Sequence, residues 1–354
     1  MIQPEPTPHP DPNLRHLAEK EYMLNGINRR RADAGLAPVE LGKNIAAQLH
    51  AEASLANCSG SHWGADGLKP YMRYTLAGGT QSNAENVSGL NYCIKRYDNF
   101  TPIESVEALI DKTMGGWMNS PGHRDNIMKP THRKVNIGLA WNLYNIMLVQ
   151  HFEGDYVEYN QLPAIVDGVL SLSGEFRNGA SPWRKEGYHG VNIQVRYDPP
   201  PKELSRGQLA NTYCYDYGDT LAFVQPSLPE GMIYQRGVSV SDTECADPYE
   251  AEANGGPTSY QEAKAAWEQA RFAAQMKPPN VWGKEVPIVE AAMWHVTEEG
   301  FDVEARLPGF LMINRNPGVY TVMVWAGVNG NLSAISEYAL WVGIDPPDAY
   351  RSVK

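Results

Sequence analysis

Long apolar runs are absent from this 354-residue sequence, in which no stretch approaches the roughly 18 apolar residues of a membrane-spanning helix. The first dozen residues are polar and rich in proline, so they lack the apolar core of a signal peptide. We therefore expect no transmembrane segment and no export signal within this chain. The protein is then either cytosolic or exported with its signal already removed.

Basic side chains are in the minority. The sequence holds 41 acidic and 30 basic side chains, a net charge of −11, which disfavours attraction to a nucleic-acid backbone or an anionic membrane. Nucleic acid is therefore not an expected partner. Most of the acidic excess lies after residue 160, whereas seven of the nine histidines lie between His9 and His151. Any chemistry is expected in the first half of the chain.

Cysteine is scarce, and the four residues Cys58, Cys93, Cys214 and Cys245 include no CxxC spacing, which argues against a zinc or redox motif. They fall as two separate pairs, one in each half of the chain. The simplest pairing is a disulfide within each half, which requires an oxidising compartment and favours export. The alternative is four reduced, buried thiols in a cytosolic protein.

The chain is too long for one compact core of ordinary size, and its 42% apolar residues suffice for a core in each half. Proline at nearly every second position from Pro4 predicts an extended linker over residues 1–12. The patterns that follow divide the remainder into a first domain over residues 13–158 and a second domain over residues 162–354.

The first domain begins with helical patterns and ends with strand patterns. Apolar spacing predicts helices from Leu14 to Gly35 and around residues 45–56. The segment Thr101-Pro102-Ile103-Glu104 matches a capping box with proline at the first helical position, which predicts the start of a third helix. Alternation over residues 135–141 and 146–152 predicts two antiparallel strands. Together these elements predict a layered α+β domain.

The second domain is predicted to be an all-β, Ig-like sandwich, because short β-branched or aromatic segments alternate with Gly, Pro and Asn turns. These segments cover residues 165–176, 191–197, 209–225, 232–240, 301–305, 320–328 and 335–342. An alanine-rich segment near 258–276 predicts an inserted helix. The aromatic residues are expected to pack on alternate strand faces rather than to form a carbohydrate- or protein-binding face; they include Tyr213, Tyr215, Tyr217, Trp325 and Trp341.

Three segments of the first domain carry side chains suited to chemistry: Ser61-His62-Trp63, Ala84-Glu85-Asn86-Val87 and residues 116–128. Their separations form no local metal motif, and a lone histidine is more often structural than a ligand. Ser120 precedes a proline, as a helix N-cap does, so we expect it to cap a helix rather than to act as a nucleophile. His151 lies on the second predicted strand and receives no role.

These segments, together with Asn28, Ala34-Gly35-Leu36 and His50-Ala51-Glu52, occur in the order seen in bacterial members of the CAP superfamily. These are SCP-like extracellular proteins, related to cysteine-rich secretory proteins, antigen 5 and plant pathogenesis-related 1 proteins. The chain resembles this family over roughly residues 17–155. The resemblance implies an α-β-α sandwich that is usually secreted.

The resemblance also implies a cavity tetrad of two histidines and two glutamates. His62, Glu85 and His123 match three of its members. The fourth, a glutamate three positions after the helix tryptophan in eukaryotic members, is replaced here by Ser120. Glu107 and Asp111, earlier on the same predicted helix, are the candidates for the missing carboxylate.

Two imidazoles and a carboxylate suit Zn²⁺ or another divalent cation, with open positions for water or a ligand. We expect an exported protein without catalytic activity that binds an extracellular or cell-surface ligand or protein and whose cavity is able to hold such a cation. The alternatives are a metal-dependent hydrolase of cell-wall or protein substrates, in which a free carboxylate acts as general base, and a lipid-binding protein.

Overall fold

The computed structural model describes residues 11–90, 102–185, 188–234, 237–239, 245, 247–249, 259–275, 284–309 and 317–350. Most of the linker predicted over residues 1–12 therefore lies outside the described residues, and the description opens at a 3₁₀ turn, Pro12–Leu14. Among the described helices, none is long and apolar enough to cross a membrane.

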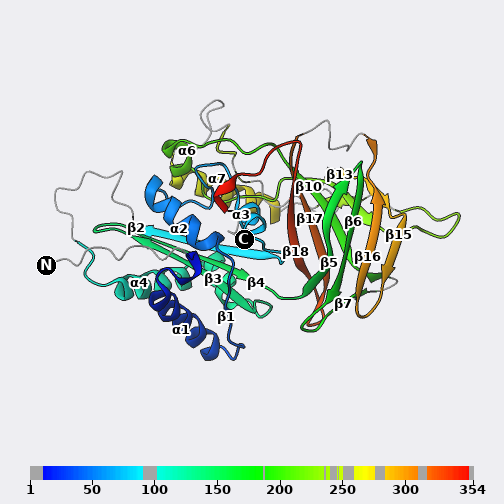
Figure 1. The fold of residues 1–354 in the computed structure, drawn as a ribbon. Helices are drawn as coiled ribbons and strands as arrows, with labels where there is room; N and C mark the ends of the chain where they lie inside the picture. Colours follow the sequence, from blue (N-terminus) through cyan, green and yellow to red (C-terminus); the bar gives the residue numbers. More distant parts are fainter. Residues whose placement is uncertain are drawn as a thin grey trace.

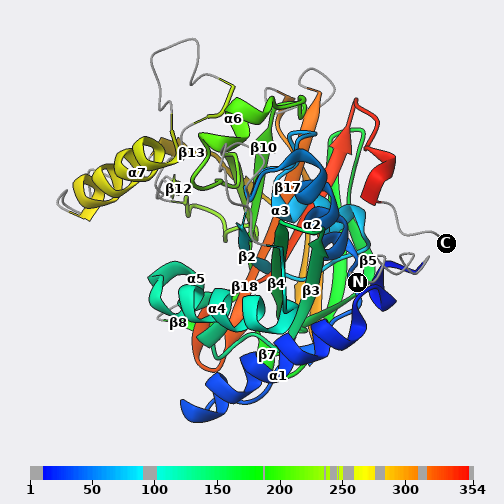
Figure 2. The same ribbon diagram turned by 90° about the vertical axis from the view of Figure 1, so that its left-hand side faces the viewer.

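The first part of the chain forms three layers around one sheet (Figures 1 and 2). The sheet has the strand order β1-β3-β4-β2. The strands are β1 (Glu40–Leu41), β2 (Asn83–Leu90), β3 (Lys134–Trp141) and β4 (Ile146–Glu153), and the helices are α1 (Leu17–Asp33), α2 (Ala46–Asn57), α3 (Pro70–Leu76), α4 (Val106–Asn119) and α5 (Pro121–Met128). The α-β-α sandwich is thus present.

Helices cover both faces of this sheet, which explains why β3 and β4 are buried along almost their whole length. On one face, Met23 of α1 and Met114 of α4 pack against Leu139 in a single apolar cluster. On the other face, Ala51 of α2 packs with Val149. The antiparallel β3–β4 pair and the first two helices agree with the sequence patterns.

The third helix begins later than its capping-box pattern predicts. Ser105 is the N-cap of α4, and its Oγ accepts a hydrogen bond from the backbone N–H of Ala108 at 3.1 Å. Ile103 lies before the helix, where its backbone N–H donates to the carbonyl oxygen of Leu143 at 2.8 Å. This hydrogen bond to the β3–β4 turn therefore keeps Ile103 out of the helix. Thr101, the first residue of the predicted capping box, lies outside the described residues.

The second part of the chain is rich in β-structure and holds two larger sheets, with strand orders β14-β11-β10-β17-β18, to which β7 adds, and β15-β16-β6-β5. The strands are β5 (Val157–Val166), β6 (Val169–Phe176), β7 (Ala180–Ser181), β8 (Trp183–Lys185), β9 (Tyr188–Gly190), β10 (Asn192–Asp198), β11 (Asp219–Gln225), β12 (Gly237–Ser239), β13 (Lys284–Val286), β14 (Ile288–Glu290), β15 (Met293–Val296), β16 (Gly300–Arg306), β17 (Gly318–Val328) and β18 (Asn331–Val342). Both sheets contribute to one buried core, which contains Leu172 and Val303 from one sheet and Ile193 and Val322 from the other. The Ig-like assignment stays a prediction.

One predicted strand of the second part differs from the structure, whereas the predicted inserted helix is present. Residues 209–225 do not form one strand: α6 (Arg206–Ala210) is followed by an irregular segment over residues 211–218 and then by β11. The helix predicted near 258–276 is present as α7 (Tyr260–Gln275). The short gap between the two predicted domains, residues 159–161, lies within β5.

A buried polar contact joins the two parts. Lys69, just before α3, places Nζ 2.6 Å from Oδ1 of Asp198 and 2.6 Å from Oδ1 of Asp216. Tyr71 of α3 donates its hydroxyl to the other carboxylate oxygen of Asp198 at 2.5 Å. An apolar cluster of α3 and β18 residues surrounds this contact, including Met72 and Ala339. The outer face of the β10–β17–β18 sheet is thereby held against α3 of the first part.

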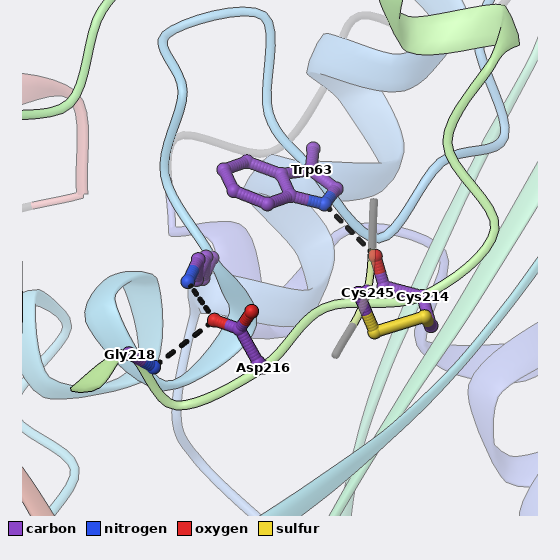
Figure 3. The surroundings of a disulfide bond; sticks show 6 residues. Trp63, Cys214, Asp216, Gly218 and Cys245 are labelled. Atoms are coloured by element: carbon purple, nitrogen blue, oxygen red, sulfur yellow. Dashed lines mark hydrogen bonds and ion pairs between the residues drawn. A yellow bond between two sulfur atoms is a disulfide. The ribbon is translucent and has the colours of Figure 1, made fainter. Parts of the chain in front are cut away.

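Cys214 and Cys245 form a disulfide, as expected from their position in the same half of the chain. Figure 3 shows Trp63 beside it, with the indole N–H donating to the carbonyl oxygen of Cys214 at 3.0 Å. Cys58 is also disulfide-bonded, and its expected partner Cys93 lies outside the described residues. The alternative of four reduced thiols is thus wrong.

Candidate functional site

Glu85 is the centre of a buried hydrogen-bond network. It lies on β2 directly opposite His151 of β4, and Nε2 of His151 is 2.5 Å from its Oε2. Nδ1 of His62 is 2.8 Å from Oε1. The guanidinium of Arg73 on α3 donates to Oε2 at 2.9 Å. Both carboxylate oxygens are therefore engaged by protein groups.

The environment of Glu85 keeps it ionised. Burial alone would raise the pKa of this carboxyl, but Arg73, the nearby His50 and the hydrogen bonds from His151 and His62 hold the pKa well below its usual range. A general base works best when its pKa lies near the working pH. Glu85 is thus suited to fix the orientation of His62 and is poorly suited to accept a proton from a substrate.

His123 forms a local pair with Ser120 at the start of α5. Its Nδ1 is 2.9 Å from Oγ of Ser120, and its ring lies 6.3 Å from the ring of Trp117. Burial, with a smaller contribution from the charge of His62, lowers the pKa of His123 to about 4. The imidazole is therefore neutral near pH 7.

Ser120 occupies the N-cap position of α5, and Pro121 follows it in the first turn, as the sequence predicts. Its side chain, however, makes no capping bond to the helix backbone. The hydroxyl binds the ring of His123 instead, because that imidazole lies one turn later and reaches back over the helix start. Ser120 therefore positions His123.

Two asparagines attach α5 to the edge strand of the sheet. Asn126 donates to the carbonyl oxygen of Glu85 at 3.2 Å and to Oδ1 of Asn86 at 2.9 Å. Asn86 in turn donates to the carbonyl oxygen of His123 at 3.1 Å. These bonds bring His123 to the same edge of the sheet as Glu85, to which His62 is bonded.

His62, Glu85, Ser120 and His123 all line one cavity of about 1330 Å³. The opposite wall comes from the second part of the chain. Residues of its outer sheet face, of the segment 211–218 and of α7 line that wall: Asn192, Gln194, Arg196, Thr212, Tyr213, Cys214, Tyr215, Tyr217, Phe223, Lys264, Trp267, Glu268, Met323, Trp325, Leu332, Ser333, Ala334 and Glu337. The cavity is thus a joint feature of both parts.

The Cysteine-rich secretory protein family model, CAP, matches residues 24–152. This part of the chain is a CAP domain. Solved structures similar to this chain include an extracellular protein containing an SCP domain from Bacillus anthracis str. Ames, at 19% identity and a TM-score of 0.32, with 42% of this chain and 45% of that chain covered. Another is an outer surface protein from Borrelia burgdorferi, at 13% identity and a TM-score of 0.29, with 39% and 92% covered. Curated protein sequences gave no significant match.

Glu107 and Asp111 do not replace the missing glutamate of the CAP tetrad. Both lie on the exposed side of α4. Oε2 of Glu107 accepts a hydrogen bond from Ser105 at 3.0 Å, and Oδ2 of Asp111 accepts one from the hydroxyl of Tyr22 at 2.8 Å. The buried face of this helix is apolar, so its carboxylates point to solvent.

His151 is the residue of the CAP domain that the sequence pattern missed. It is fully buried, and its role follows from the antiparallel register of β2 and β4. By contrast, His50 and His132 make structural contacts: His50 contacts the carbonyl oxygen of Ser61, and His132 stacks on Phe152. Burial lowers the pKa of each of these two histidines to about 3.

Three of the five aromatic residues singled out in the second part, the tyrosines, do not lie on strands as predicted. Tyr213, Tyr215 and Tyr217 belong to the irregular segment 211–218 and line the cavity, as does Trp325 of β17. Trp341 packs against the cluster that joins α3 to β18. Strand alternation therefore does not explain the tyrosines, because the segment that carries them is irregular and packs against CAP-domain residues such as Trp63 and Tyr71.

A three-ligand metal site is not formed by the described residues, among which no three His, Cys, Asp or Glu side chains are grouped to hold an ion. Glu85 is engaged on both oxygens, which removes it from the expected set. His62 and His123 each use Nδ1 for a contact within the protein and keep Nε2 for another group. Metal binding stays a prediction that rests on these two imidazoles.

Proposed function

We propose that this chain is an exported binding protein without catalytic activity, and that its ligand occupies the cavity between the CAP domain and the second, β-rich part. The single observation that carries the proposal is the joint lining of this cavity by His62, Glu85 and His123 on one side and by the outer face of the second part on the other. Ordinary small-molecule pockets measure about 300–1,000 Å³, so a cavity of about 1330 Å³ suits an extended or oligomeric ligand.

The disulfides support export. Cys214–Cys245 is formed and Cys58 is disulfide-bonded, and such bonds persist in oxidising compartments. The expected location is therefore extracellular or at the cell surface, which agrees with the secreted character implied by the resemblance to SCP-like proteins.

The state of the titratable groups supports binding over catalysis. Glu85 is ionised, and both of its carboxylate oxygens are already hydrogen-bonded to protein groups. Ser120 and His123 are paired, but a histidine with a pKa of about 4 is a weak base for activating a hydroxyl at neutral pH. These groups hold the wall of the cavity in one geometry, and this favours recognition over hydrolysis.

A divalent cation such as Zn²⁺ is a second, narrower proposal for the same wall. Nε2 of His62 and Nε2 of His123 would hold the cation, and its positive charge would attract an oxygen atom of the ligand. With only two protein ligands the binding would be weak and reversible. Metal analysis of the purified chain, beside the double variant His62→Ala/His123→Ala, tests this: zinc retained equally by both proteins contradicts it.

The binding proposal is tested by calorimetric titration of the full chain with three kinds of probe: neutral oligosaccharides, short peptides and phosphatidylcholine vesicles. Ala334 lines the cavity, so Ala334→Trp fills it. The matched control is Ala32→Trp at the exposed end of α1. We expect one probe to bind without being cleaved, binding to be lost in Ala334→Trp, and binding to be kept in the control.

The same probes, with peptidoglycan and ester substrates added, test the alternative. Hydrolysis by the wild-type chain that disappears in His123→Ala would show that the protein is a hydrolase and overturn the binding proposal.

A further inference from the structure

The outer face of the sheet opposite the CAP domain carries polar and aromatic residues in neighbouring rows. Across the strands, Gln194 of β10 pairs with Met323 of β17, which pairs with Glu337 of β18. In the next row, Asn192 pairs with Trp325. Side chains alternate along a strand, so residues on the other face belong to the buried core. All five residues line the cavity.

Four of the residues that line the cavity carry buried polar atoms without a partner in the described part of the chain. These atoms are Nδ2 and Oδ1 of Asn83, Oδ1 of Asn192, Nε1 of Trp325 and Oε2 of Glu337. Asn83 and Glu337 are only 4% and 3% exposed. A buried polar group left unpaired costs about 1–3 kcal/mol, so a cluster of them beside one cavity indicates that a ligand supplies the missing partners.

The unpaired atoms include hydrogen-bond donors and acceptors, so a ligand must supply both acceptors and donors. The indole N–H of Trp325 needs an acceptor, the carbonyl of Asn192 needs a donor, and the amide of Asn83 needs both. Oε2 of Glu337 needs a donor when the carboxyl is ionised and an acceptor when it carries the proton. A hydroxyl group donates one hydrogen bond and accepts two. A ligand with many hydroxyls therefore matches this wall, whereas an acyl chain would leave every one of these groups unpaired.

Aromatic rings line the neighbouring part of the cavity. Tyr213, Tyr215 and Tyr217 on the segment 211–218 and Trp267 on α7 are all partly exposed there. The rings of Tyr213 and Trp267 lie 5.3 Å apart. Tyr215 and Tyr217 pack on Tyr71 and on each other, so the apolar ring surface beside the polar groups comes chiefly from Tyr213 and Trp267.

The charges around the cavity are balanced. Three basic and three acidic side chains line it: Lys129, Arg196, Lys264, Glu85, Glu268 and Glu337. A cavity selective for phosphate or for an acidic polymer would carry an excess of Arg and Lys. This balance favours a neutral ligand.

We propose that the ligand is a neutral oligosaccharide, whose hydroxyls pair with Asn83, Asn192, Trp325 and Glu337 and whose ring C–H faces pack on the aromatic side chains. The inference rests on the proposed binding function and names its ligand class. It places most of the recognising groups on the second part of the chain, with Asn83 of β2 contributed by the CAP domain.

Calorimetric titration of the full chain with cellohexaose, chitohexaose and mannohexaose tests this proposal. We expect at least one of them to bind, with an affinity that does not change between low and high salt because the ligand is neutral. Trp325→Phe keeps the ring and removes the N–H donor, and Asn192→Ala removes the amide; each is expected to weaken binding about tenfold. Trp267→Ala, on the partly exposed helix α7, is expected to weaken it similarly without affecting folding.

Trp294→Phe on β15, in the other sheet, is the matched control and is expected to leave the affinity unchanged. Binding of none of the three oligosaccharides, or oligosaccharide binding that is unaffected by all three cavity variants, overturns the inference. If a peptide or a vesicle binds instead and Ala334→Trp abolishes that binding, the carbohydrate inference fails while the binding function stands. If the chain instead cleaves an oligosaccharide and this cleavage disappears in His123→Ala, the proposed ligand class stands. The proposal that the protein has no catalytic activity then fails.

Discussion

Arg73 and Glu85 form an ion pair in which both side chains are fully buried, with Nη2 of the arginine 2.9 Å from Oε2 of the glutamate. The same guanidinium donates to the backbone carbonyl oxygens of His62 at 2.9 Å and Leu68 at 2.5 Å. Arg73 therefore joins α3 both to the carboxylate that orients His62 and to the backbone of His62 itself.

Removing this arginine leaves a buried carboxylate without its cation. We expect Arg73→Met to lower the free energy of unfolding by about 3–5 kcal/mol, because the desolvation of Glu85 is then uncompensated. Urea unfolding measures the loss. The control Arg177→Met removes a guanidinium that is 45% exposed and is expected to cost below about 1 kcal/mol. Equal losses of unfolding free energy in the two variants would contradict the role of Arg73 as the buried counter-charge of Glu85.

Lys69 is expected to hold the two parts of the chain together. It neutralises Asp198 and Asp216, and burial raises the pKa of Asp198 even with the lysine present. Lys69→Met should therefore destabilise the contact by about 3–5 kcal/mol and expose the segment 211–218 to limited proteolysis. Lys134→Met, in a half-exposed ion pair with Asp155, is the control. A proteolysis pattern identical to that of the wild type would count against this role.

The stability of the protein should depend on the protonation of Glu337. Burial raises the pKa of this carboxyl from 4.5 to about 7, although the hydroxyl of Ser82 donates to it. The folded state then retains a proton that the unfolded chain releases, so this group's contribution to stability is present at low pH and declines as the pH rises from about 4.5 to 7.

Glu337→Gln fixes a neutral side chain of the same size. We expect its stability relative to the wild type to increase by up to about 3 kcal/mol between pH 4 and pH 8, as measured by urea unfolding at each pH. Glu304→Gln, at an exposed position on β16, should show a constant difference from the wild type over the same range. A constant difference for Glu337→Gln as well would refute the prediction.

The Cys214–Cys245 disulfide closes a loop with a sequence separation of 31 residues. By the chain-entropy relation such a bridge stabilises by at most about 4 kcal/mol. We expect the double variant Cys214→Ser/Cys245→Ser to unfold at lower urea concentration and to expose Trp63, whose indole donates to the backbone of Cys214. Unchanged tryptophan fluorescence and an unchanged unfolding midpoint would show that other contacts hold this segment.

Local signals in the sequence were sufficient for a large part of the CAP domain. Helical spacing located α1 and α2, and alternation located β3 and β4, because each of these patterns depends on neighbours within a few residues. The ordered motifs also placed His62, Glu85 and His123, all of which line the cavity. By contrast, β2 was missed as a strand, because its polar residues are buried through hydrogen bonds rather than through apolar alternation.

The sequence by itself thus determined the two helices, the strand pair, the CAP family and three candidate residues. Only the tertiary structure decided which groups meet: His151 with Glu85, 66 residues apart, and Lys69 with Asp198, 129 residues apart. It also brought the outer face of a second sheet against the CAP domain to complete the cavity. The physical reason is that strand register and the docking of two cores depend on contacts far apart in the chain, which leave no mark in the periodicity of either segment.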